Sequence, residues 1–296
     1  MELNYTISEA DNYINVKQVL KELFGISDRL LLKLKNHQSI FLNECEVYVN
    51  HPVSVNDNIK VKIDFEEDNS NVVPYKMDLD IIYEDDYYII INKPANISIH
   101  PSMCNYNNSL SNGVRYYFDT IGLKKKIRPV NRLDKDTSGI VIFAKNEYIQ
   151  ECLVRQMKAD TFTKQYIAIC NGYITGSNEV VNAPIARKEN SIIERCVNFA
   201  GDTAITYYSV LKNIKINDMY ISELLCTLKT GRTHQIRVHM DYIGHPILGD
   251  TLYSSASKII NRQALHSFKT SFIHPIYKNQ VEYVAPLPND ITSIIK

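Results

Sequence analysis

The stretch Arg128-Pro-Val-Asn-Arg-Leu-Asp-Lys-Asp-Thr-Ser-Gly139 runs directly into the apolar segment Ile140–Ala144. The apolar segment is largely β-branched and predicts a buried strand, and the three residues before it are typical of turns. The preceding loop is rich in lysine and arginine and carries a carboxylate, Asp134, to the start of the strand. Taken alone, Asp134 is better explained as the cap of a turn, so the rest of the chain must decide its role.

The eight residues Arg132–Gly139 resemble the signature motif of the RluA-type pseudouridine synthases, in which the aspartate is the essential catalytic residue. The resemblance therefore implies a catalytic role for Asp134. The family usually has histidine before Arg-Leu-Asp, where this chain has Asn131. Asparagine hydrogen-bonds but does not titrate near neutral pH. If the histidine meets RNA in the family, substrate preference differs here, while activity is expected to remain.

The segment Leu79–Pro94 predicts two strands around a polar turn, and Pro94 ends the second strand because it lacks an N–H. Together with His100-Pro101 it resembles the first motif of the same family. Asn96 replaces the usual glycine, and asparagine tolerates positive φ, so the turn is expected to persist. We expect Lys93 to be structural or to face phosphate, rather than to be catalytic.

The alternating segment Lys164–Ile169 predicts a strand and resembles the family's second motif. The resemblance implies that Tyr166 lies in the active site beneath the target base. An ordinary half-buried strand tyrosine is the alternative. A helix is predicted over Asn146–Ala159, between this strand and the Asp134 strand.

The segment Leu228-Lys-Thr-Gly-Arg-Thr-His-Gln-Ile-Arg-Val-His-Met240 resembles the third motif. A strand is predicted over 219–228, followed by a helix that begins near Thr233, whose hydroxyl is expected to be the N-cap. The resemblance implies that Arg237, rather than Arg232, pairs with the catalytic Asp134, and that Ile236 packs at the base pocket. The family order continues to about residue 290.

The sequence predicts neither a metal site nor a cofactor site. His234 and His239 are five residues apart, about 140° round a helix, so they do not share a face as a two-histidine metal site requires. Glycine-rich nucleotide-binding motifs are absent. The cysteines form no C-x-x-C pair, which predicts reduced thiols in the cytoplasm. They are Cys45, Cys104, Cys152, Cys170, Cys196 and Cys226.

The zero net charge conceals an uneven distribution along the chain. Residues 1–100 hold 17 acidic and 9 basic residues, whereas residues 101–296 hold 16 acidic and 24 basic residues. A basic region predicts a polyanion partner such as RNA, although solvated faces also account for it. No apolar run approaches the ~20 residues of a membrane span, and no signal-peptide pattern opens the chain. We therefore expect no membrane partner.

The first part of the chain predicts a small α/β unit. Helices are expected over 16–23 and 27–34, with Ser27 as N-cap of the second, and strands over 41–49 and 59–63. This order is similar to the alpha-L RNA-binding module that often precedes the catalytic domain of these synthases. The similarity implies RNA contact through Arg29 and Lys33, with a purely packing role as the alternative. The expected boundaries are 1–66 for the module, 67–76 for a linker and 77–296 for the catalytic domain.

The expected fold class is α+β, with a mixed, mostly antiparallel sheet preceded by the small α/β module. The function that the resemblance implies is isomerisation of uridine to pseudouridine in structured RNA, ribosomal RNA of the large subunit first and tRNA second. The reaction needs no cofactor, and the protein is expected to be a monomer. The residues expected to contact RNA are Lys126, Arg128, Asn131, Arg132, Arg232, Ile236, Arg29 and Lys33.

Asp134 must be ionised in this chemistry, and a paired arginine opposes the tendency of a buried carboxylate to become neutral. Nucleophilic attack on the base or sugar and deprotonation at the ribose 2′ position remain open. Two other classes of function also remain open for this protein. One is a non-catalytic RNA-binding assembly factor. The other is a glycosidic hydrolase, which usually needs two carboxylates, and here only Asp134 and Asp136 are close in sequence.

Overall fold

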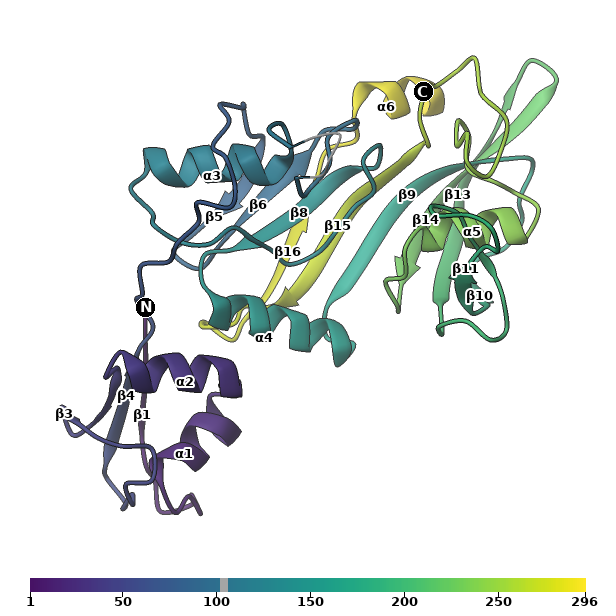
Figure 1. Ribbon diagram of the computed structural model, residues 1–296. Coiled ribbons are helices and arrows are strands. Elements are labelled where there is room, and N and C mark those ends of the chain that lie inside the picture. Colours follow the sequence, from purple (N-terminus) through teal and green to yellow (C-terminus); the bar gives the residue numbers. More distant parts are fainter. Residues whose placement is uncertain (102–105) are drawn as a thin grey trace.

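The computed structural model describes residues 1–101 and 106–296, so Cys104 lies outside the described residues. The chain folds into a small N-terminal module below a much larger sheet domain (Figure 1). The module holds a four-stranded antiparallel sheet in the order β1-β4-β2-β3. Its elements are β1 (Glu2–Thr6), α1 (Val16–Gln18), the π-helical turn η1 (Val19–Leu23), α2 (Asp28–Asn36), β2 (Ile40–Leu42), β3 (Cys45–Glu46) and β4 (Asn58–Lys62).

Three features of the module test the sequence analysis. Ser27 caps α2 as predicted, because its Oγ accepts the Leu30 N–H at 3.2 Å. The single strand predicted over 41–49 is wrong. The chain reverses at Asn43 and Glu44, both at positive φ, and forms the hairpin of β2 and β3. Strand β1 was not predicted.

The large domain is built on a ten-stranded sheet in the order β10-β13-β14-β9-β15-β8-β6-β5, with β16 beside β15 and β7 beside β8. All pairs are antiparallel except β15 with β8, which confirms the expected mixed, mostly antiparallel sheet. Its strands are β5 (Ile81–Glu84), β6 (Tyr88–Lys93), β7 (Arg128–Pro129), β8 (Ser138–Ala144), β9 (Thr163–Asn171), β10 (Glu179–Asn182), β13 (Ile205–Ile216), β14 (Met219–Leu228), β15 (Leu265–Ile273) and β16 (Gln280–Val284).

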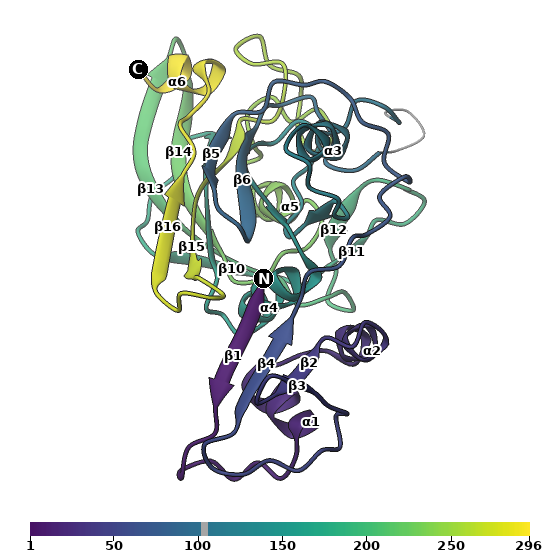
Figure 2. The ribbon, with the colours of Figure 1, turned by 90° about the vertical axis from the view of Figure 1, so that its left-hand side faces the viewer.

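Four helices and a separate hairpin complete the domain (Figures 1 and 2). They are α3 (Leu110–Thr120), α4 (Glu147–Lys158), α5 (Gln235–Tyr242), α6 (Asn289–Ile295) and the strands β11 (Ile185–Arg187) and β12 (Arg195–Val197). Within the described residues, no helix is both long enough and apolar enough to cross a bilayer.

Strand β8 is buried on both faces because alternate side chains enter different cores. Val141 and Phe143 pack with α3, whereas Ile140 and Ile142 belong to the core that includes α4. The strand is fixed at its start by Gly139, whose φ is +109° and where a Cβ would lie 2.2 Å from the Ser267 carbonyl oxygen. The loop that carries Asp134 therefore leads into one of the most constrained strands of the sheet.

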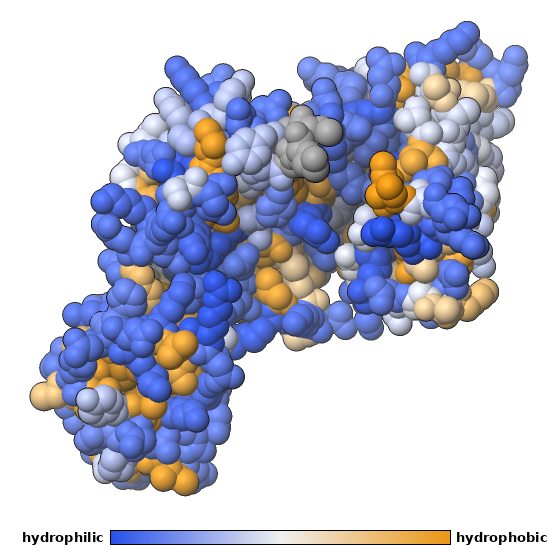
Figure 3. Space-filling model, in the orientation of Figure 1, coloured by the Kyte–Doolittle hydropathy of each residue, from blue (hydrophilic) through white to orange (hydrophobic). Residues whose placement is uncertain are grey.

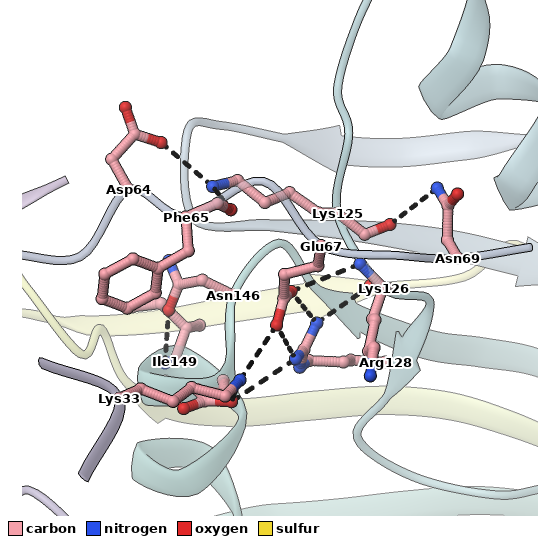
Figure 4. Close-up of polar contacts among 11 residues, drawn as sticks. Lys33, Asp64, Phe65, Glu67, Asn69, Lys125, Lys126, Arg128, Asn146 and Ile149 are labelled. Carbon is pink, nitrogen blue, oxygen red and sulfur yellow. Dashed lines mark hydrogen bonds and ion pairs between the residues drawn. The ribbon is translucent and has the colours of Figure 1, made fainter. Parts of the chain in front are cut away.

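The segment between the module and the sheet domain is anchored by buried charges (Figure 4). The two terminal nitrogens of Arg128, Nη1 and Nη2, donate to Glu67 at 2.6 and 2.7 Å, and Lys33 Nζ lies 3.2 Å from the same carboxylate. Lys33 also pairs with Glu147. The Arg128 and Glu67 side chains are 7% and 9% exposed. Internal carboxylates pair with both Arg128 and Lys33, and contact of these two side chains with RNA stays a prediction.

Glu67 gives the protein a defined acid sensitivity. Burial alone raises the pKa of Glu67, but Arg128 and Lys33 outweigh it and lower that pKa from 4.5 to about 2. A depressed carboxylate pKa contributes stability that is present above the unfolded pKa and lost as pH falls towards the folded pKa. We expect Glu67 to contribute about 3 kcal/mol above pH 4.5 and to lose this between pH 4.5 and about 2.

Urea unfolding of wild type and Glu67→Gln across this pH range measures the effect. At neutral pH the variant should have a lower free energy of unfolding than wild type, because it lacks the contribution of the Glu67 carboxylate. Its free energy of unfolding should also change less as the pH falls from 4.5 to about 2. Glu66→Gln is the matched control, because Glu66 is 78% exposed and pairs only with Lys124 among the described residues. Parallel profiles for wild type and Glu67→Gln would contradict the assignment.

Candidate active site

Asp134 lines a cavity of about 370 Å³ between the loop that precedes β8 and the turn that precedes α5. A smaller adjoining cavity of about 60 Å³ is lined by Asp134, Tyr166, Ile236 and Arg237. The space-filling view shows a largely hydrophilic face, interrupted by apolar side chains between the two halves of the sheet domain (Figure 3). The structure therefore brings Asp134, Tyr166, Ile236 and Arg237 together from three separate parts of the sequence.

Arg237 links Asp134 to a second carboxylate. Its Nη1 donates to Asp134 Oδ2 at 2.8 Å, while Nε and Nη2 donate to Asp250 at 2.6 and 2.8 Å. Burial alone lowers the pKa of Arg237, but the bonds and charges of Asp250 and Asp134 raise it above its ordinary value. The expected ion pair between Arg237 and Asp134 is present. Asp250, 1% exposed, was missed as its support because a single aspartate after glycine has no distinctive pattern.

The turn before α5 is closed differently from the prediction. The expected N-cap at Thr233 is wrong, because the N-cap residue is His234, at φ 57° and without a capping hydrogen bond. Instead Gln235 Oε1 accepts the Arg232 N–H at 3.0 Å and the Thr230 hydroxyl at 2.8 Å. With its own backbone in this left-handed conformation, His234 has its side chain directed towards Asp134.

His234 is a further neighbour of the carboxylate that the sequence analysis did not assign to the site. Its Nε2 lies 3.7 Å from Asp134 Oδ2, and its Nδ1 lies 2.9 Å from the Tyr253 hydroxyl. The Tyr253 oxygen also accepts the Arg195 N–H. Burial lowers the pKa of His234, although the charge of Asp134 opposes the shift. Asp134 therefore faces a permanent cation and a predominantly neutral imidazole.

Tyr166 lies on β9 and is 6% exposed, with its side chain lining both cavities. Burial raises the pKa of Tyr166 to about 12. A hydrogen bond with Ser267 opposes the shift, and the charge of Asp134 adds to it. Tyr166 is consequently protonated at neutral pH, and Ile236 supplies an apolar contact on the same side of the smaller cavity.

Lys93 and Asn131 hold the backbone around the loop that carries Asp134. The fully buried Lys93 ammonium donates to the carbonyls of Pro94, Ile97 and Lys135 at 2.8–2.9 Å. Burial lowers the pKa of Lys93 to about 7, and the charge of Asp136 opposes that shift. Asn96 adopts φ 66°, so the expected turn is present.

The side-chain amide of Asn131 is hydrogen-bonded within the protein, and its contact with RNA stays a prediction. Its Nδ2 donates to the Ile140 carbonyl at 2.9 Å, and its Oδ1 accepts the Ile142 N–H at 2.9 Å. The amide therefore pairs with the β8 backbone in the way a neighbouring strand does. Although Asn131 lines the larger cavity, its polar atoms are engaged in holding the loop.

A third cavity, of about 330 Å³, lies beside the cavity that Asp134 lines and is itself lined by Arg132, Arg187, Arg195 and Arg232. Arg187 and Arg195 lie directly opposite each other in the β11–β12 hairpin. Like charges in this position destabilise a strand pair. Among the described residues, only Arg232 of the four has an ion-pair partner, Asp202 at 3.3 Å. Arg187 and Arg195 were missed because the sequence does not show that the hairpin returns to this cavity.

Two further predicted RNA contacts lie outside the three cavities. Arg29 is exposed on α2, and Lys126 is exposed in the loop before β7. The backbone N–H of Lys126 donates to Glu67, so this loop is tied to the linker. The structure therefore separates the predicted basic residues into cavity residues, surface residues and internal ion pairs.

Residues 87–242 match the family model described as RNA pseudouridylate synthase. The chain belongs to the RluA-type RNA pseudouridine synthase family. It is 36% identical to the uncharacterized RNA pseudouridine synthase YhcT of Bacillus subtilis, covering 94% of this chain and 91% of that protein. It is also 31% identical to the ribosomal large subunit pseudouridine synthase D of Escherichia coli, covering 100% and 94%.

A solved structure agrees with this family assignment. The human RNA pseudouridylate synthase domain containing 1 superimposes with a TM-score of 0.60 and 26% identity, over 71% of this chain and 83% of that chain. Enzymes of the family are isomerases that act on RNA, so the chain is an RNA pseudouridine synthase by class.

Proposed function

We propose that the protein isomerises a specific uridine to pseudouridine in structured RNA, with Asp134 as the catalytic carboxylate. The observation that carries the proposal is the Asp134–Arg237 pair at 2.8 Å in a cavity that Tyr166 also lines. The N1–C1′ bond breaks, a C5–C1′ bond forms, the C5 proton leaves, and N1 gains a proton. Atoms and electrons balance within this sequence, so the reaction consumes no redox cofactor or nucleotide.

The target uridine has to leave its stack to reach Asp134, at a cost of a few kcal/mol. We assign Tyr166 as the platform under the uracil and Ile236 as an apolar contact, because both line the smaller cavity. Arg132 is exposed and lines all three cavities beside Asp134, so it is placed to fill the vacated stack or to hold phosphate. The choice between attack by Asp134 and deprotonation at the ribose 2′ position stays open.

Large-subunit ribosomal RNA is the first candidate substrate, and tRNA is the second. The 31% identity to ribosomal large subunit pseudouridine synthase D extends over the whole chain, including the N-terminal module. We assign the module, residues 1–66, as an RNA-binding unit joined by the linker 67–76 to the catalytic domain. The described cysteines Cys45, Cys152, Cys170, Cys196 and Cys226 are free thiols, which suits a protein working in the cytoplasm.

The four-arginine cavity is assigned to phosphates that flank the target. Arg187→Gln/Arg195→Gln should weaken RNA binding and lower the slope of log K against log salt by roughly 0.7 per lost phosphate contact. Filter binding of the transcript over a salt series measures the slope. Lys188→Gln is the control in the same hairpin, because Lys188 pairs with Glu194 at 3.1 Å. An unchanged slope in the double variant would show that this cavity does not bind the phosphates that flank the target.

Release of tritium from RNA labelled at C5 of uridine tests the proposed reaction. Release to water, with no free uracil, supports isomerisation, whereas free uracil indicates a hydrolase. The hydrolase alternative lacks support in the geometry, because Asp250, the second carboxylate on Arg237, is 1% exposed and both its oxygens accept hydrogen bonds. RNA binding without tritium release, on naked RNA and on precursor ribosomal subunits, would favour a non-catalytic assembly factor.

A further inference from the structure

The N-terminal module is fixed to the sheet domain by polar contacts with α4. Ser27 Oγ donates to Glu151 Oε1 at 2.6 Å, and Arg155 Nη1 donates to the Gly25 carbonyl at 2.6 Å. Gly25 has φ +63°, and a Cβ there would lie 1.8 Å from Arg155 Nη1. The two surfaces therefore approach closely at a left-handed position that favours glycine.

Apolar packing continues across the same interface. The module residues Leu20 and Leu30 share one core cluster with Tyr148, Ile149 and Leu153 of α4. The Tyr148 hydroxyl also donates to a module carbonyl, that of Phe24, at 3.0 Å. A continuous core resists the relative motion that a polar linker alone permits.

The helix that carries the module also supports the catalytic loop. Gln150 Nε2 donates to the Pro129 carbonyl at 3.1 Å, and Arg128 Nη2 lies 3.6 Å from Glu147. Both contacts fall on β7, which leads directly into the loop that carries Asp134. Figure 4 shows Lys33 of the module and Arg128 of β7 converging on the linker carboxylate of Glu67.

We propose that this interface selects the target by fixing the distance and direction from the module to Asp134. We call it the module clamp, and its polar residues are Ser27, Lys33, Glu67, Glu147, Glu151 and Arg155. An RNA is a good substrate when it presents the target uridine and a second structured element at the separation that the clamp imposes. The clamp residues determine specificity without touching RNA, and this inference rests on the function proposed above.

The module has an exposed face suited to that second element. Arg29, Leu32 and Lys35 point outward from α2, whereas Lys33 on the same helix is turned inward to the clamp. In the side view, α2 and the β11–β12 hairpin lie on the same side of the molecule (Figure 2). One RNA can therefore meet both surfaces from one direction.

The test compares two substrates once the modified uridine is mapped. One is the full transcript, and the other is a hairpin with only the target loop and its closing pairs. We expect Lys33→Gln/Arg155→Gln to lower kcat/KM for the full transcript by roughly 10- to 100-fold, because a loosened module has a lower effective concentration at its RNA site. The hairpin should be modified at the wild-type rate. Small-angle X-ray scattering of the variant should show a larger maximum dimension.

Lys17→Gln/Lys158→Gln is the matched control. It removes one exposed lysine from the module and one from α4, outside the clamp, so the charge loss is the same. The control should keep the wild-type ratio of kcat/KM for the full transcript to kcat/KM for the hairpin. A clamp variant that becomes extended but keeps this ratio would overturn the inference, as would an equal loss on both substrates, which would indicate a damaged active site. Absence of tritium release by wild type would instead overturn the proposed function, while scattering still reports the clamp.

Discussion

Asp134→Asn should abolish tritium release while leaving RNA affinity within a factor of about two. Turnover should fall by roughly 10⁴- to 10⁶-fold, the range seen when an enzyme loses the group that forms or breaks bonds. The Asn amide keeps the size of the side chain and can still accept the Arg237 N–H that now reaches Asp134 Oδ2 at 2.8 Å. What it loses is the negative charge and the nucleophilic or basic oxygen that the reaction needs.

Asp136→Asn is the matched control for this loss. It makes the same chemical change two residues along the same loop, but Asp136 lines neither of the two cavities that Asp134 lines. Its turnover should stay close to that of wild type. Lost RNA binding in Asp134→Asn, or equal losses in the two variants, would make Asp134 a structural residue of the loop.

Arg237→Met should lower both stability and turnover. The change leaves the 1% exposed Asp250 carboxylate without its guanidinium partner, and breaking a buried pair in this way typically costs about 3–5 kcal/mol. Urea unfolding at neutral pH measures the stability loss. Tritium release by the folded fraction should also fall strongly, because Asp134 loses the cation that orients it.

The double variant Arg237→Met/Asp250→Leu separates these two effects. Replacing both members of a buried ion pair with apolar side chains often restores stability. We therefore expect much of the unfolding free energy to return while tritium release stays low. Recovery of both properties together would show that Arg237 acts on catalysis only through folding.

The sequence predicted the parts of the site that depend on local pattern. Strand β14 spans the residues 219–228 that were predicted for it, and the motif that holds Arg237 follows the Asp134 motif in the order typical of the family. The support of Arg237 by Asp250 could not be predicted, because it depends on a turn that returns through space rather than on spacing along the chain. Asn131 is similar, since only the structure shows its amide bonded to the β8 backbone.

Basic residues were the least predictable group. Arg128 and Lys33 were expected to meet RNA, but they meet Glu67 and Glu147 inside the protein. Arg187 and Arg195 were not selected, yet the hairpin register places them together at a cavity. The sequence shows the sign of the charge on a side chain, whereas the partner of that charge depends on which distant segment the fold brings beside it.

The shared core of the module and α4 has a consequence for synthesis of the chain on the ribosome. Although the module is made first, the core cluster that holds its residues Leu20 and Leu30 is completed by Tyr148 and Leu153 only after α4 has left the exit tunnel. Until then the contacts between the module and α4 cannot form. The order of translation therefore differs from the order of folding, and the module reaches its final packing after about half of the chain has been translated.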